Sequence, residues 1–91
     1  MDSIMFYVYV LKSRKDASLY VGYTNDLKRR FEEHNNGKSF ATKNKAPFEI
    51  VYYEAYQSKS DAKYRETNLK RHSGAYTHLK KRIQNSLIES M

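Results

Sequence analysis

Side chains alternate between apolar and polar or aromatic types in three stretches of the chain, at residues 5–12, 18–23 and 48–56. A period of two predicts β-strands, because successive side chains of a strand point to opposite faces of the sheet. The short polar segment 13–17 between the first two stretches predicts an antiparallel hairpin. The third stretch has apolar residues on both faces, which predicts that it is the central strand.

The same alternation assigns side chains to faces. In the first stretch, one face carries Phe6, Val8 and Val10, and the other carries Tyr7, Tyr9 and Leu11. In the third, one face carries Phe48, Ile50 and Tyr52, and the other carries Val51, Tyr53 and Ala55. In the second, Tyr20 and Gly22 share a face, and a glycine within a strand lets another group come close to the backbone.

Three more stretches are predicted to be helices, at about residues 26–36, 61–71 and 75–88. Thr24 or Asn25 is expected to cap the first helix, and Gly37 to end it. Ser58 or Ser60 is expected to cap the second. The third has an apolar stripe at Leu79, Ile83 and Leu87.

The predicted order is therefore β-β-α-β-α-α, which describes an α+β domain with a three-stranded antiparallel sheet flanked by helices. The chain has 91 residues, which suits one domain over residues 1–91. Its core is expected at about residues 5–72, followed by the C-terminal helix at 75–88.

The first helix has two cationic residues where apolar ones are expected. At about 100° per residue, Arg30 and His34 share one face with Leu27 and Phe31. Arg30 could lay its apolar stem on the core edge and keep its charge in water. His34 could be a cation favoured by the end of the helix. The other interpretation is that both belong to a functional site.

The second helix has a carboxylate in its apolar stripe, because Glu66 lies between Ala62 and Leu69 at helical spacing. An unpaired carboxylate is costly to bury and needs a partner. An ion pair with Arg30 or Lys70 would satisfy it. A hard divalent cation would also do so, with water and phosphate oxygens completing its coordination.

The formal net charge is +7, with 17 Lys and Arg residues, which favours a polyanionic partner such as nucleic acid over a merely soluble basic protein. The absence of cysteine excludes disulfides and thiolate metal sites. No apolar run reaches the roughly 20 residues needed to cross a bilayer. The first residues lack the pattern of a signal peptide. We therefore expect a cytoplasmic protein without a membrane partner.

Taken together, these residues resemble the GIY-YIG nuclease family over about Phe6 to Lys70, and most closely its small stand-alone bacterial members. The paired tripeptides of the family signature are matched by Tyr7-Val8-Tyr9 and Tyr20-Val21-Gly22. The helix with the catalytic arginine is matched by the segment from Tyr23 to His34, which includes Arg30, and the helix with the metal-binding glutamate by Ala62 to Lys70, which includes Glu66. Tyr7 departs from the signature, because it stands in place of the first glycine. Asn85 is a candidate for an asparagine that the family often has near its site.

The resemblance implies an endonuclease that hydrolyses DNA phosphodiester bonds with a single divalent ion, Mg²⁺ or Mn²⁺. By this resemblance Glu66 would hold the metal and Arg30 would bind phosphate oxygens. Tyr9 or Tyr20 would orient or deprotonate the attacking water, and His34 would relay a proton or position phosphate.

Basic residues outside this site are expected to contact the DNA backbone without reading sequence. They are Lys38, Lys43, Lys45, Lys70, Lys80, Lys81 and Arg82. The expected activity has little sequence specificity, prefers a DNA structure if anything, and fits DNA repair or recombination.

Two alternatives stay open. The same scaffold could bind nucleic acid without cutting it, or it could be an interaction protein whose partner surface is formed by Tyr52, Tyr53 and Tyr56.

Overall fold

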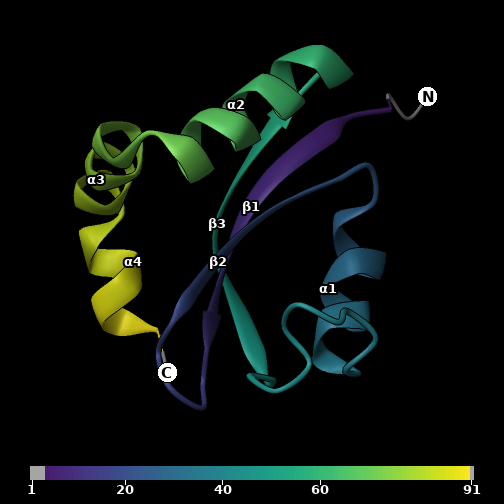
Figure 1. Ribbon diagram of the computed structural model, residues 1–91, viewed down its shortest axis with the longest axis vertical. Helices are drawn as coiled ribbons and strands as arrows, with labels where there is room; N and C mark the ends of the chain where they lie inside the picture. Colours follow the sequence, from purple (N-terminus) through teal and green to yellow (C-terminus); the bar gives the residue numbers. More distant parts are fainter. Residues whose placement is uncertain (1–3, 91) are drawn as a thin grey trace.

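A twisted antiparallel sheet runs through the middle of the computed structural model, which describes residues 4–90 (Figure 1). Its strands are β1 (Phe6–Ser13), β2 (Leu19–Thr24) and β3 (Phe48–Tyr56), in the order β2-β1-β3. The expectation that the third strand is central is therefore wrong, because β1 holds that place. β1 is buried on both faces, whereas β3 lies at an edge and exposes Tyr53.

A bulge in the pairing of β1 with β3 explains why β3 looks apolar on both faces. Val10 pairs with Tyr52, but the next residue, Leu11, pairs with Ile50, so Val51 is an extra residue. The bulge moves Tyr52 to the face opposite Ile50, which contradicts the expected grouping of these two residues. The alternation predicted for β1 is confirmed, as is the shared face of Tyr20 and Gly22.

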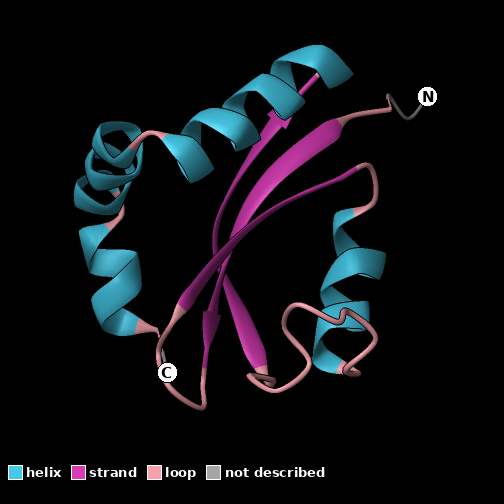
Figure 2. Ribbon diagram, viewed as in Figure 1, coloured by secondary structure: helices cyan, strands magenta, loops and turns pink. Residues whose placement is uncertain are grey.

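Helices cover both faces of the sheet (Figure 2). One face carries α1 (Leu27–Asn35), and the other carries α2 (Lys59–Arg71), α3 (Ser73–Arg82) and α4 (Gln84–Glu89). The expected single helix at residues 75–88 is thus two helices, with a break at Ile83. The break lets Leu87 pack against the core, where its carbonyl accepts a hydrogen bond from Lys12 at 2.7 Å. None of the helices within residues 4–90 is long and apolar enough to cross a lipid bilayer.

The central strand divides the interior into two cores. On the face covered by α2 and α3, the buried residues are Val8, Val10, Val21, Ala62, Leu69, Leu79 and Ile83. On the face covered by α1 they are Tyr9, Leu11 and Phe48, with Tyr20, Leu27, Phe31, Ala46 and Ile50 packed around them. The first core is aliphatic and the second is largely aromatic. The second therefore brings polar ring atoms into the interior.

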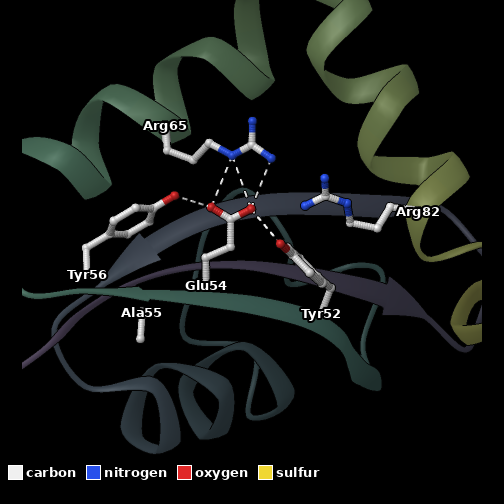
Figure 3. A pocket seen from close by; sticks show the side chains of 6 residues that line it. All are labelled: Tyr52, Glu54, Ala55, Tyr56, Arg65 and Arg82. Atoms are coloured by element: carbon white, nitrogen blue, oxygen red, sulfur yellow. Dashed lines mark hydrogen bonds and ion pairs between the residues drawn. The ribbon is translucent and has the colours of Figure 1, made fainter.

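Glu54 on β3 ties the sheet to α2 (Figure 3). Its carboxylate accepts hydrogen bonds from Nε and Nη2 of Arg65, three in all and the shortest at 3.0 Å. It also accepts one each from the hydroxyls of Tyr52 and Tyr56. Burial opposes the charge, but these bonds outweigh it and hold the pKa of Glu54 below its ordinary value. Arg65 directly precedes Glu66, so the same ion pair sets the position of the helix turn that carries Glu66.

We predict that Glu54→Gln lowers the free energy of unfolding by about 2 kcal/mol, because it leaves the partly buried Arg65 guanidinium without its anion. Urea unfolding measures the change. Glu32→Gln removes an exposed carboxylate and is the matched control. Equal stability of the two variants would show that the Glu54–Arg65 pair does not hold α2 on the sheet.

Candidate active site

The side chain of Tyr9 crosses from the central strand to the neighbouring strand β2. Its ring is 1 % exposed, and its hydroxyl lies against Gly22, the residue that pairs with it across the sheet. A Cβ atom built on Gly22 would overlap this hydroxyl and the ring carbon that bears it. The missing side chain of Gly22 therefore makes the space in which the end of Tyr9 lies.

His34 in the last turn of α1 meets Tyr9 in the core. Its Nε2 is 2.8 Å from the Tyr9 hydroxyl, and its Nδ1 is 2.6 Å from Oγ1 of Thr42. The ring is fully buried, and burial, assisted by the charge of Arg30, lowers the pKa of His34 to about 4. His34 is therefore neutral at pH 7, and the interpretation of it as a cation at the helix end is wrong.

A neutral imidazole donates from one nitrogen and accepts at the other. The bonds of His34 on both sides therefore run in one direction, from Tyr9 through His34 to Thr42 or the reverse. Tyr9, His34 and Thr42 thus form a short hydrogen-bonded chain along which a proton can shift. Burial raises the pKa of Tyr9 to about 12, with the charges of Tyr20 and Glu66 adding to the rise and Arg30 opposing it.

Tyr20 on β2 completes the aromatic cluster. Its ring centroid is 5.2 Å from that of His34 and 6.4 Å from that of Tyr9. The ammonium of Lys70 lies 5.6 Å from the centroid of the Tyr20 ring. Tyr20 is half-buried and so lies between the buried pair and the surface.

Arg30 lies one helical turn before His34, and its side chain is 30 % exposed. Its guanidinium donates hydrogen bonds to Glu33 at 3.0 Å and to Ser39 at 3.2 Å. Burial works against its charge, yet Glu33 and Tyr9 raise the pKa of Arg30 above its ordinary value. Arg30 borders a hollow of about 430 Å³ that also contains the cations Arg29 and Lys59. The residues that line it are Tyr23, Thr24, Asn25, Arg29, Arg30, Glu33 and Lys59.

Glu66 comes from α2, on the other side of the sheet. Its side chain is 16 % exposed and is paired with Lys70 at 3.1 Å and Lys63 at 3.8 Å. The expected ion pair with Lys70 is confirmed, and the alternative pair with Arg30 is not formed. The carboxylate is close enough to Tyr9 to raise the pKa of that residue. Glu66 therefore shares an electrostatic environment with the cluster on β1, β2 and α1.

Few side chains near Glu66 could ligate a metal ion. Within residues 4–90 no three His, Asp or Glu side chains are grouped as metal ligands. Glu66 alone fits a hard cation that takes most of its ligands from water and a bound phosphate. Its two lysine partners are exposed by about half, at 54 % and 46 %, so they can leave the carboxylate at little cost.

The predicted DNA-contacting residues divide into two groups. Lys38, Lys43 and Lys45 lie in the segment 36–47 between α1 and β3, on the α1 side of the sheet. Lys80, Lys81 and Arg82 lie on α3, on the opposite side (Figure 1). Arg82 borders the hollow of about 510 Å³ beside Glu54. Lys70 of α2 belongs to neither group and lies near the tyrosine cluster, because its ammonium lies over the Tyr20 ring and is bonded to Glu66.

Two hydroxyl residues of the site were not predicted from the sequence. Ser39 and Thr42 are buried and hold Arg30 and His34, respectively. The one available signal was that a buried histidine needs a second hydrogen-bond partner, which does not say where in the chain that partner lies.

The partner surface proposed for an interaction protein is not formed. The hydroxyls of Tyr52 and Tyr56 are bound to Glu54, so these two side chains serve the fold. Tyr53 on the opposite face is exposed by 54 %. The three tyrosines therefore do not make one aromatic patch.

The family model for the GIY-YIG catalytic domain matches residues 5–84, which include every side chain of the cluster described above. The chain belongs to the GIY-YIG family.

Curated relatives agree with this assignment. The chain is similar to UPF0213 protein CPE1444 of Clostridium perfringens, with 44 % identity over 68 residues, or 74 % of this chain and 72 % of that protein. It is also similar to a UPF0213 protein of Staphylococcus aureus, with 43 % identity over 82 residues, or 89 % of this chain and 92 % of that protein. The solution NMR structure of the UPF0213 protein BH0048 from Bacillus halodurans matches with a TM-score of 0.50 and 35 % identity, and covers 85 % of this chain and 86 % of that one. These names state no activity, so the relatives support the α+β fold and the family.

The neutral state of His34 makes stability depend on pH. Its folded pKa, about 4, lies below its unfolded value, so its contribution is full above pH 6.5 and is lost as the pH falls toward 4. We predict that the free energy of unfolding falls by about 2 kcal/mol between pH 7 and pH 5, before most carboxylates titrate. Urea unfolding at both pH values tests this. His34→Gln should flatten the slope, and the exposed His78→Gln should retain it; an unchanged slope in His34→Gln would contradict the buried neutral ring.

The space at Gly22 gives a second prediction. Gly22→Ala should lower the free energy of unfolding by about 1–3 kcal/mol and displace the Tyr9 hydroxyl from His34, because the added Cβ would overlap the end of the buried ring and force it to move. Gly74→Ala is the matched control, since nothing lies within 4 Å of a Cβ at that position. Urea unfolding gives the stability, and the NMR shifts of the His34 ring report its bond to Tyr9. Equal behaviour of both variants would refute the close contact.

Proposed function

We propose that this protein is a metal-dependent endonuclease that hydrolyses DNA phosphodiester bonds with little sequence specificity. The observation that carries the proposal is the hydrogen bond between Tyr9 and a neutral, buried His34, with the charges of Arg30 and Glu66 near enough to shift the pKa of Tyr9. Membership of a nuclease family supports the reaction class. The residue roles below extend the proposal to this chain.

Arg30 binds the scissile phosphate in this proposal. Its planar guanidinium suits two-point contact with phosphate oxygens, and its bonds to Glu33 and Ser39 orient it before a substrate arrives. Arg29 and Lys59 in the same hollow add positive charge for the strand. Charge that is fixed in place beforehand stabilises the transition state without a cost of reorganisation.

Tyr9 accepts the proton of the attacking water. Its pKa of about 12 disfavours a free tyrosinate, so its own proton must leave as the new one arrives. His34 Nε2 is 2.8 Å from the Tyr9 oxygen and takes that proton, while Nδ1 keeps its hydrogen bond to Thr42. The water oxygen bonds to phosphorus, the bond from phosphorus to the leaving oxygen breaks, and solvent returns a proton to that oxygen. Tyr20, half-buried beside the pair, positions the water.

Glu66 binds the divalent ion. A Mg²⁺ or Mn²⁺ ion held by Glu66 would supply positive charge against the phosphate and the leaving oxygen. Before Glu66 can bind the ion, the Lys70 ammonium must move away from its carboxylate. The same movement uncovers the Tyr20 ring, over which that ammonium lies. Glu66 thus links metal binding to access by water.

The remaining basic residues bind the DNA backbone. Lys38, Lys43 and Lys45 lie on the Arg30 side of the sheet and can extend the contact along the strand. Contacts of this kind carry little sequence information, which fits a role in repair or recombination, where the substrate is defined by its shape.

The second candidate function is nucleic-acid binding without cleavage. It is favoured by the pairing of Glu66 with two lysines and by the high pKa of Tyr9, since both features oppose the chemistry. It needs only the basic surface.

We predict that the wild-type protein nicks plasmid DNA in Mg²⁺ or Mn²⁺ and not in EDTA. Glu66→Gln and Tyr9→Phe should each lower the rate by about 100-fold or more, because each removes a group that acts in the transition state. Glu32→Gln, which removes an exposed carboxylate of α1, is the control and should cut normally. Cleavage is followed on agarose gels. If the wild type bound DNA but did not nick it in either metal, the result would contradict the nuclease proposal and support nucleic-acid binding without cleavage.

A further inference from the structure

The segment 36–47 between α1 and β3 is fastened to the proposed catalytic residues. Its buried Ser39 accepts a hydrogen bond from Arg30, and its buried Thr42 is bonded to His34. Near its end, the carbonyl of Lys45 accepts a hydrogen bond from Ser13 at 2.6 Å. The segment, which Figure 2 draws as the pink loop after α1, is therefore held at several points along its length.

Between the two buried hydroxyl residues, Phe40 points outward and is 86 % exposed. It is the most exposed large hydrophobic side chain in the described part of the chain. The ammonium of Lys43 lies 4.8 Å from the centroid of its ring. Single exposed apolar side chains are common, but this one lies on a fixed segment, next to a cation and one residue from the Arg30 contact.

An exposed ring adds little to the stability of the fold, since it stays in contact with water. A flat aromatic face beside a cation suits a nucleotide, whose base stacks on the ring and whose phosphate meets the cation. Phosphates follow one another at roughly 3.4 Å or more along a strand, and successive Cα atoms at about 3.8 Å. Phe40 is therefore within a few nucleotides of a phosphate bound at Arg30.

We propose that Phe40 and Lys43 form a binding site for an unpaired nucleobase of the strand held at Arg30. The inference rests on the proposed function for the nearby phosphate, and it names the feature that selects the substrate. Bases inside a duplex are already stacked on each other, so the ring competes for a base only where pairing is interrupted. Every base has a stacking face, so the site selects for single-stranded regions, ends and branches without selecting a sequence.

Binding of a single-stranded oligonucleotide that contains 2-aminopurine tests the proposal in EDTA, where no cleavage interferes. We expect Phe40→Ala to weaken binding about tenfold and to remove the quenching of 2-aminopurine fluorescence caused by stacking. Phe40→Tyr should bind like the wild type, whereas Phe40→Leu, which is apolar but has no ring, should bind like Phe40→Ala. Duplex of the same sequence should bind all four proteins within about twofold, because its bases are not free to stack.

Tyr64→Ala is the matched control, because Tyr64 is an aromatic residue on α2 that is 71 % exposed. It should bind the single strand normally. An RNA strand of the same sequence tells whether the unpaired base can come from either nucleic acid, and a Phe40-dependent loss on either one supports the site. Equal binding by Phe40→Ala and wild type on both strands, or full binding by Phe40→Leu, would overturn the proposal.

The outcomes separate this inference from the nuclease proposal. Phe40-dependent quenching without plasmid nicking would leave the base site in place and reject the nuclease. Plasmid nicking together with binding that does not depend on Phe40 would support the nuclease and reject the base site. Urea unfolding of Phe40→Ala should match the wild type, since the ring is exposed, which keeps a folding defect from imitating lost binding.

Discussion

The bond between the Tyr9 hydroxyl and His34 is the constraint on which the site depends, because a polar group in the core must find a partner. Tyr9 belongs to the central strand, Gly22 leaves space for its end on β2, and His34 brings the last turn of α1 onto it. Thr42 then satisfies the second nitrogen of His34 and draws in the segment that follows α1. One hydrogen-bonded series thus joins the central strand, a helix and a connecting segment. The groups that hold this half of the fold together are the same groups that the proposed reaction uses.

The opposite face of the sheet serves the site by holding α2. Val8 and Val10, which alternate with Tyr9 on β1, pack against that side, so one strand supports both halves of the structure. The Glu54–Arg65 ion pair fixes the rotation of α2 one residue before Glu66. Glu66 therefore reaches the tyrosine cluster from a helix whose position is set by a charge network on β3. The two carboxylates on this side of the sheet have different tasks. Glu54 is fully occupied by Arg65 and two tyrosine hydroxyls, whereas the partners of Glu66 are two half-exposed lysines.

Most of the fold could be predicted from local pattern, and much of the site could be predicted from polar residues in apolar positions. Period-two alternation gave the three strands, and Arg30, His34 and Glu66 stood out because each lies in an apolar stripe of its helix. The order of strands could not be read in this way, because the bulge at Val51 makes an edge strand look apolar on both faces. The break at Ile83 was hidden because its stripe continues through the helix end. Ser39 and Thr42 were missed because their partners are distant in sequence and a hydroxyl in a connecting segment carries no periodic signal.

Electrostatics explains how a neutral histidine can take part in proton transfer at this site. In the free protein, burial and the nearby Arg30 charge both keep His34 unprotonated. A phosphodiester bound at Arg30 brings a negative charge that offsets the guanidinium, and it replaces water around the cluster, which strengthens the remaining charge interactions. In the proposed reaction this offset would raise the proton affinity of His34 when the substrate binds, at the stage where Tyr9 passes on a proton. Burial, the larger cause of the low pKa of His34, stays in place, but the Arg30 charge that adds to it is the one that a bound phosphodiester would offset. The low pKa of His34 in the free protein is in this way consistent with its proposed role.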